Sequence, residues 1–270
     1  GAVTLNAGTS INATSYQWFD LATNTNIANT DTVTITPPVG ATTQYYVVVS
    51  NGVCSVNDTV SYTVFPSIIA HAGNDTTICI GGSVTLNASS SVNGTNYNWF
   101  QMPGNTNIGN SVSVTVTPAL GTTSYYVVVD NGNSCSANDT ITITAIALPI
   151  AHAGNDSILC KPSTVTLNAS TSINATSYQW FDVTTNTNIG NTDTFTVTPP
   201  VGATTQYYVV VSNGVCSVND TVSYTVFPSI IAHAGNDTTL CIGGSATLNA
   251  SSSVNGTNYN WFQMPGSTNI

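Results

Sequence analysis

The feature that most constrains this chain is an internal repeat at regular spacing. The segment Ala-His-Ala-Gly-Asn-Asp occurs around His71, His152 and His233, and each copy is followed by a cysteine and a Val/Ala-Thr-Leu-Asn-Ala segment. A second period lies over the first, because residues 1–108 match residues 163–270 at all but eleven positions. The copies are 81 residues apart, and repeats of this length predict one folding unit per repeat, arranged in series.

Near-identity at twice the repeat length indicates that two repeat types, A and B, alternate along the chain. The predicted domains are residues 1–68 (type A), 69–149 (type B), 150–230 (type A) and 231–270 (type B). The first lacks the opening cysteine segment and the last stops half-way through the pattern. We therefore expect the chain to be a stretch of a longer repeat protein.

Composition narrows the class of protein. The chain has 11 acidic residues, all Asp, and one basic residue, Lys161, so that charged residues make up 4% of it. One cation cannot neutralise a row of phosphates, so nucleic-acid binding and attraction to an anionic membrane surface are excluded. No apolar run approaches the roughly 20 residues of a membrane helix, so we expect no membrane insertion.

The hydrophobic pattern within a repeat predicts strands and lacks a helical period. In the second repeat, apolar and polar residues alternate over short segments that end in turn residues, as half-buried strands require. The predicted strands are residues 83–89, 97–100, 111–117, 123–130 and 137–145. About seven short strands per repeat, with a Trp on the third, are typical of an immunoglobulin-like sandwich. The fold class is therefore all-β, with tandem immunoglobulin-like sandwiches; short apolar linkers containing Pro66, Pro149 and Pro228 favour an extended, fairly rigid rod.

The six cysteines allow two regular pairings. One joins Cys54–Cys79, Cys135–Cys160 and Cys216–Cys241 across the linkers. The other joins Cys79–Cys135 and Cys160–Cys216 within domains and leaves Cys54 and Cys241 to partners outside this sequence. In an immunoglobulin-like sandwich the first and last strands run parallel, so their starts are neighbours, which favours the pairing within domains. Either pairing implies an oxidising, extracellular setting.

Catalytic and metal-binding patterns are missing from the sequence. There is no Glu, no G-x-S-x-G or HExxH motif, and the Asp residues are single rather than paired. We predict no enzyme activity, no cofactor and no metal centre; isolated carboxylates in loops leave structural calcium as a weak alternative. The repeated His is interpreted as a linker residue, and Trp18, Trp99, Trp180 and Trp261 as core residues rather than a sugar-binding platform.

Asp followed by Thr or Ser is the most distinctive local motif. It occurs at eight of the eleven Asp residues. One interpretation is structural, because Asp in turns and at strand starts bonds nearby backbone. The other is O-glycosylation of the hydroxyl that follows. The candidate residues are Thr32, Thr59, Thr76, Thr140, Ser157, Thr194, Thr221 and Thr238.

These motifs together resemble the Ig-like/PKD-like repeats of large secreted surface proteins of Bacteroidota, among them gliding-type adhesins and substrates of type IX secretion. The motifs that carry the resemblance are Ala-Gly-Asn-Asp-x-x-x-Cys, Val-Thr-Leu-Asn-Ala, Tyr-x-Trp-Phe, Thr-Thr-x-Tyr-Tyr-Val-Val-Val and Cys-Ser-x-Asn-Asp-Thr. The resemblance implies a location outside the cell or at its surface. It also implies O-glycosylation at Asp-Thr/Ser before a small or apolar residue, as at Asp58-Thr59-Val60, and Thr194 departs from that pattern because Phe195 follows it.

The functional hypothesis is a non-catalytic stalk or spacer of a glycosylated extracellular adhesin or surface fibre. Its expected partners are further repeats or other copies of itself, covalent glycans, and an unknown surface or polysaccharide ligand. Two alternatives stay open: a subunit of a laterally assembled filament, and accessory or polysaccharide-binding repeats of a large secreted hydrolase.

Overall fold

The structure is a computed structural model that describes residues 1–265 and 268–269. Within that part every regular element is a β-strand, and none of the described residues forms a helix able to cross a membrane. The all-β prediction is therefore confirmed. The chain divides into two compact units: residues 1–76, 83–118 and 122–143 form one, and residues 77–82, 119–121 and 144–270 form the other.

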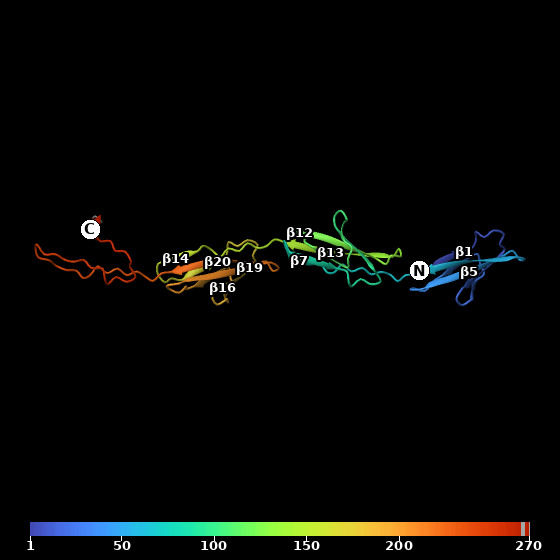
Figure 1. Ribbon diagram of the computed structural model, residues 1–270, viewed down its shortest axis with the longest axis horizontal. Coiled ribbons are helices and arrows are strands. Elements are labelled where there is room, and N and C mark those ends of the chain that lie inside the picture. The colour runs from blue at the N-terminus through green and yellow to red at the C-terminus, as the bar shows by residue number, and fades with distance from the viewer. Residues whose placement is uncertain (266–267, 270) are drawn as a thin grey trace. The chain divides into compact units, whose positions relative to one another are not determined.

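The third repeat forms a complete seven-stranded sandwich. One sheet has the order β14-β20-β19-β16-β17 and the other pairs β15 with β18. Figure 1 labels β14, β16, β19 and β20 of this sandwich. The short β14 runs parallel to β20, whereas the other pairs are antiparallel. The strands are β14 (Ser157–Leu159), β15 (Val165–Asn168), β16 (Ser177–Asp182), β17 (Thr187–Gly190), β18 (Thr194–Val197), β19 (Thr204–Ser212) and β20 (Ser217–Val226).

The second repeat has the same arrangement, with sheets ordered β10-β9-β12-β13-β7 and β11-β8. Its strands are β7 (Thr76–Cys79), β8 (Val84–Asn87), β9 (Asn96–Gln101), β10 (Thr106–Gly109), β11 (Ser113–Val116), β12 (Gly121–Asp130) and β13 (Ser136–Ile146). The five strands predicted in this repeat all overlap observed strands. Period-2 patterning located them correctly because one face of each strand is buried and the other is wet.

The first repeat has six strands and no counterpart of β7 or β14 in residues 1–68. Its sheets are ordered β3-β2-β5-β6 and β1-β4. The strands are β1 (Val3–Asn6), β2 (Ser15–Asp20), β3 (Asn26–Ala28), β4 (Thr32–Ile35), β5 (Thr42–Ser50) and β6 (Ser55–Thr63). In residues 231–270 the described strands are β21 (Phe262–Gln263) and β22 (Thr268–Asn269).

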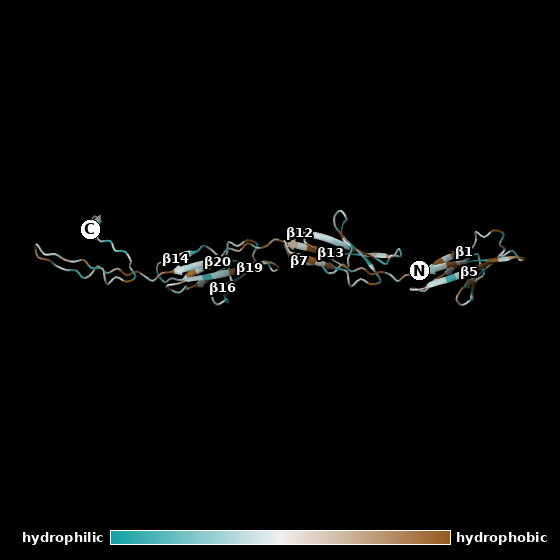
Figure 2. Ribbon diagram, in the orientation of Figure 1, coloured by the Kyte–Doolittle hydropathy of each residue, from teal (hydrophilic) through white to brown (hydrophobic). Residues whose placement is uncertain are grey.

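Each core forms where the inward residues of the two sheets meet. In the third repeat Trp180, Leu167, Val209 and Val222 are fully buried. The alternation that places them appears in Figure 2 as strands of mixed brown and pale or teal colour. On the outer face Phe181 stacks on Tyr208 across β16 and β19, with the ring centroids 4.9 Å apart. The Trp residues of the three sandwiches are therefore core residues, as expected from their strand positions.

The segment before each opening strand is tied to its own repeat. Ile69 and Val92 exchange backbone hydrogen bonds of 3.1 and 2.8 Å, and Ile150 and Ile173 do the same at 2.9 and 3.0 Å. The Ile69 and Ile150 side chains stay about half exposed. The linker is thus held by its backbone.

Candidate functional site

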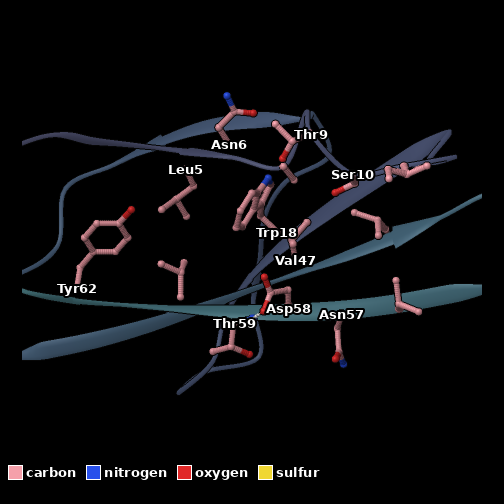
Figure 3. A pocket seen from close by; sticks show the side chains of 15 residues that line it. Leu5, Asn6, Thr9, Ser10, Trp18, Val47, Asn57, Asp58, Thr59 and Tyr62 are labelled. Atoms are coloured by element: carbon pink, nitrogen blue, oxygen red, sulfur yellow. Dashed lines mark hydrogen bonds between the residues drawn. The ribbon is translucent and has the colours of Figure 1, made fainter.

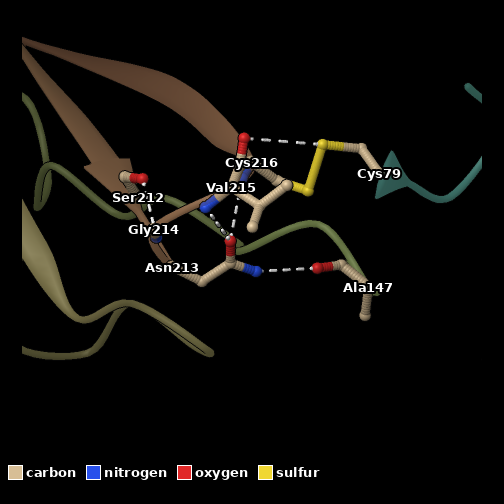
Figure 4. The surroundings of a disulfide bond; sticks show 7 residues. All are labelled: Cys79, Ala147, Ser212, Asn213, Gly214, Val215 and Cys216. Atoms are coloured by element: carbon tan, nitrogen blue, oxygen red, sulfur yellow. Dashed lines mark hydrogen bonds between the residues drawn. A yellow bond between two sulfur atoms is a disulfide. The ribbon is translucent and has the colours of Figure 1, made fainter. Parts of the chain in front are cut away.

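A disulfide joins Cys79, the last residue of β7, to Cys216, which precedes β20 (Figure 4). The two Cα atoms are 5.7 Å apart and the cysteines are 137 residues apart in sequence. Both belong to the second compact unit. The bond therefore connects the opening strand of one repeat with a hairpin of the next repeat.

The short opening strand determines where Cys79 lies. The residue after it, Ile80, donates its backbone N–H to the carbonyl of Ile146, the last residue of β13, at 2.8 Å. The third repeat has the same register, with Leu159 opposite Val226, the last residue of β20. The opening strand thus runs beside the final residues of the last strand, which places its cysteine at the end of the sandwich where the chain leaves.

Asn213 determines where Cys216 lies. Its side-chain Oδ1 accepts the backbone N–H of Cys216 at 2.9 Å, and its Nδ2 donates to the carbonyl of Ala147 at 3.0 Å. Gly214, with φ of +95°, lets the β19–β20 hairpin turn in a conformation that L side chains rarely adopt. Cys216 is 1% exposed, so the hairpin holds its sulfur in a fixed and shielded position.

The structure corrects both predicted pairs, Cys79–Cys135 and Cys160–Cys216. The opening and last strands are parallel, as expected, but the opening strand pairs with the end of the last strand and not with its start. Cys79 lies next to Ile146, whereas Cys135 precedes Ser136, ten residues earlier on the same strand. Ten strand residues span roughly 33 Å, and bridged Cα atoms lie within about 7 Å.

The other four cysteines, Cys54, Cys135, Cys160 and Cys241, are free in the structure. The cross-linker pairs Cys54–Cys79 and Cys216–Cys241 are also not formed, because Cys79 and Cys216 bond each other. That Cys54 and Cys241 pair outside this sequence stays a prediction.

The Asp-Thr motif has a structural role that local sequence could not reveal. Asp139 Oδ2 accepts the backbone N–H of Ala72 at 2.8 Å, 67 residues away, and Asp75 Oδ1 accepts that of Thr142 at 2.8 Å. The third repeat has the same two bonds, from Ala153 to Asp220 and from Ser223 to Asp156, both 2.8 Å long. Two carboxylates therefore clip the opening segment of each complete repeat to its last strand.

The predicted glycosylation residues lie at the surface. Thr32, Thr59, Thr76, Thr140, Thr221 and Thr238 are exposed, as is Thr194, and Ser157 is half-buried. Thr59, Thr140 and Thr221 occupy the same position of β6, β13 and β20. Because strand side chains alternate, the Asp turns toward the opening segment and the Thr turns to solvent.

Other candidate ligands are dispersed. Among the described residues no group of three or more His, Cys, Asp or Glu side chains gathers at one point. His71, His152 and His233 are exposed, and their backbone N–H groups are bonded by Ser91, Ser172 and Ser253.

The first sandwich has an open groove in its core (Figure 3). The cavity has a volume of about 570 Å³ and is lined by Leu5, Trp18, Val47, Asp58 and Tyr62 among others. In the third repeat the equivalent face is covered by the opening segment. Asp58, at the strand position of Asp220, accepts the N–H of its neighbour Thr59 at 2.8 Å.

One indole group of the first sandwich lacks a hydrogen-bond partner among the described residues. Trp99 and Trp180 donate their Nε1–H to the carbonyls of Ser111 and Thr192, each at 3.1 Å. The Nε1 of Trp18 is buried and has no acceptor among the described residues.

Comparison with protein families agrees with this architecture. The family described as "Ig-like domain CHU_C associated" matches three consecutive stretches, residues 1–66, 66–149 and 147–229. The chain belongs to this family. The CHU_C-associated domain is a Bacteroidota-type repeat, so the resemblance seen in the sequence is confirmed. The sequence matches no curated protein.

Solved structures similar to this chain are also tandem immunoglobulin-like or fibronectin-like domains. An I-band fragment of titin aligns with 84% of this chain and 92% of its own length, at 11% identity and a TM-score of 0.42. Extracellular domains 3–5 of Drosophila OTK align with 85% of this chain and 92% of their own length, at 10% identity and a TM-score of 0.40. The fibronectin(III)-like modules of Clostridium thermocellum CbhA cover 60% of this chain and 95% of theirs, at 12% identity and a TM-score of 0.35.

Tandem CHU_C-associated repeats with a disulfide are typical of extracellular or cell-surface proteins. The immunoglobulin-like fold generally serves structural or binding roles rather than catalysis. The family match and the sheet topology establish that the chain consists of tandem immunoglobulin-like repeats.

Proposed function

We propose that this chain is a non-catalytic spacer in the stalk of a glycosylated extracellular adhesin or surface fibre. The observation that carries the proposal is the series of self-contained sandwiches, of which two consecutive repeats are covalently linked through Cys79 and Cys216. A spacer needs length and resistance to unfolding, and both come from the repeated fold and not from any one side chain.

The nearly uncharged surface supports the glycan part of the proposal. With 4% charged residues, the chain keeps its exposed faces polar mainly through Thr, Ser and Asn. Hydroxyls at Thr59, Thr140 and Thr221 recur at one exposed strand position after Asp. Glycans there would add hydration and would shield the backbone from proteases.

The spacer role is tested by replacing residues 69–230, two whole repeats, in the parent protein with unrelated immunoglobulin-like modules of equal length. A spacer should keep its surface display and adhesion after the replacement, and should lose adhesion when the same residues are deleted. If the length-matched replacement loses adhesion, the repeats themselves bind the ligand and the spacer proposal is wrong.

The glycan part is tested separately by glycopeptide mapping of protein from its native source. We expect added mass on Thr59, Thr140 and Thr221. Bare hydroxyls at all three positions would refute glycosylation and would leave the spacer proposal standing.

A further inference from the structure

The six cysteines belong to two structural classes. Three follow an opening segment: Cys79, Cys160 and Cys241. Of these, Cys79 and Cys160 lie where the chain leaves a sandwich. Three lie in the hairpin before the last strand: Cys54, Cys135 and Cys216. The observed bond joins one member of each class, from consecutive repeats, across 137 residues. Cys160 is the opening cysteine one whole repeat after Cys79, and Cys216 is the hairpin cysteine of the repeat that Cys160 opens.

We propose that this bond is one link of a regular series, in which the opening cysteine of each repeat bonds the hairpin cysteine of the next repeat. Within this chain only Cys79 and Cys216 belong to the right classes at this separation. The rule therefore explains why one bond forms while four other cysteines stay free. Their partners are the matching cysteines of further repeats of this kind. This inference goes beyond the spacer role and does not depend on adhesion.

Matching geometry recurs outside the bonded pair, at the opening strand of the third repeat and at the hairpin of the first. Cys79 is the last residue of β7, and Cys160 directly follows β14. β14 pairs with the last strand, β20, in the same register in which β7 pairs with β13. Cys54 lies in a hairpin of the same kind as Cys216, where the Oδ1 of Asn51 accepts the backbone N–H of Cys54 at 2.9 Å. The hairpin of Cys135 is one residue longer, and the Oδ1 of Asn131 there accepts the N–H of Asn133 at 3.0 Å. The backbone N–H of Asn131 bonds the Cys135 carbonyl at 3.4 Å, as that of Asn213 bonds the Cys216 carbonyl at 3.1 Å.

Each link forms by oxidation of two thiols. A disulfide-containing oxidant, such as oxidised glutathione, accepts the two electrons and two protons and leaves as two thiols while the new S–S bond forms. No group is lost from the protein except the two thiol hydrogens.

The series has a mechanical consequence, because it changes which residues bear tension. A pull on the two ends of this chain reaches Cys79, crosses the disulfide to Cys216 and continues along β20. Residues 80–215, which hold the body of two sandwiches, lie outside this covalent path. In a continuing series the path uses the short segments that span the linkers, such as residues 54–79 and 216–241. A pull would therefore not unfold the bodies of the sandwiches.

The pairing is tested by peptide mapping of the full chain refolded with oxidised glutathione. Cleavage before Asp places every cysteine on a different peptide, with Cys79 in 75–129, Cys135 in 130–138, Cys160 in 156–181 and Cys216 in 193–219. We expect a bond between peptides 75–129 and 193–219, with the other four cysteines left as alkylatable thiols or as mixed disulfides with glutathione. A bond from Cys79 to Cys135, or from Cys160 to Cys216, overturns the proposal.

The series is tested by lengthening the chain. Appending a copy of residues 109–149 after Ile270 completes the last repeat and supplies a copy of Cys135. That added cysteine follows Cys160 at the same separation at which Cys216 follows Cys79. The expected result is a second disulfide between Cys160 and the added cysteine. If both thiols stay open to alkylation while Cys79–Cys216 forms, the bond is an isolated one and the series does not exist.

The load path is tested by single-molecule stretching of the full chain. The fully extended Cys79→Ser variant should be longer than the oxidised chain by the 137 residues that the bond bypasses, and at about 3.3–3.6 Å per residue this is roughly 450–490 Å. Cys54→Ser, which removes a free thiol, should leave the oxidised length unchanged. Equal lengths for the oxidised chain and Cys79→Ser would refute the load path.

Discussion

The Asp clip of the third repeat offers a direct test of how the opening segment is held. Asp220 Oδ2 accepts the N–H of Ala153 at 2.8 Å, and Ala153 is fully buried. The change Asp220→Ala removes the acceptor and leaves a buried N–H without a partner. Because water does not reach this buried amide, nothing replaces the carboxylate as acceptor. The lost hydrogen bond should therefore lower the stability of the opening segment by its full value.

The size of the effect follows from the charge on the acceptor. A hydrogen bond to a charged group contributes about 1.5–3 kcal/mol, so opening of the segment should become roughly 10- to 150-fold more frequent. Hydrogen–deuterium exchange of residues 151–159 in the full chain measures this opening locally. The sequence of this segment differs from that of residues 70–78, so its peptides are distinguishable.

Two matched changes make the result interpretable. Asp220→Asn keeps a neutral acceptor and should raise exchange far less than Asp220→Ala. Asp58→Ala is the same change at the same strand position of the first repeat, where the carboxylate bonds only its neighbour's N–H, and exchange of residues 151–159 should not respond. Unchanged exchange in Asp220→Ala would refute the claim that this carboxylate holds the opening segment.

Three further predictions concern packing, pH and the open groove. The first and third repeats are nearly identical, but Gly190 and Phe195 of the third repeat replace Ala28 and Val33 of the first. A Cβ on Gly190 would lie 2.5 Å from the Phe195 ring. Gly190→Ala should therefore cost about 1–3 kcal/mol of unfolding free energy in denaturant melts, and adding Phe195→Val should restore most of it; additive effects would disprove the compensation. Burial raises the pKa of Tyr207 and of Tyr224, so the folded state favours the neutral phenol. The contribution of these residues to stability is complete below the ordinary pKa of about 10 and falls as the pH rises past it. The melting temperature should therefore be lower at pH 11 than at pH 8, and equal melting temperatures would contradict this. A peptide of residues 150–159 should occupy the groove of the first sandwich and change the fluorescence of Trp18. The same peptide with Ala153→Glu should not, because Ala153 is fully buried in the third repeat. Identical responses to the two peptides would show that the groove does not recognise the opening segment.

Much of the fold was predictable because its signals are local. Alternation such as Val84, Leu86 and Ala88 marks a strand without knowledge of its neighbours, and the structure buries Leu86 and Ala88 fully. The outer-face exposure of Thr140 after Asp139 follows from the same alternation. The target of Asp139 did not follow, because the amide that it binds is 67 residues away.

The sequence by itself determined the repeat length, the strands, the immunoglobulin-like class and the two structural kinds of cysteine, since each is written in short-range periodicity or in spacing. Only the tertiary structure decided which sulfur meets which. The spacing of cysteines along the chain does not show the register between two strands. In the structure, the opening strand pairs with the last residues of the final strand. That register puts Cys79 at the far end of its sandwich from Cys135 and beside Cys216 of the next repeat.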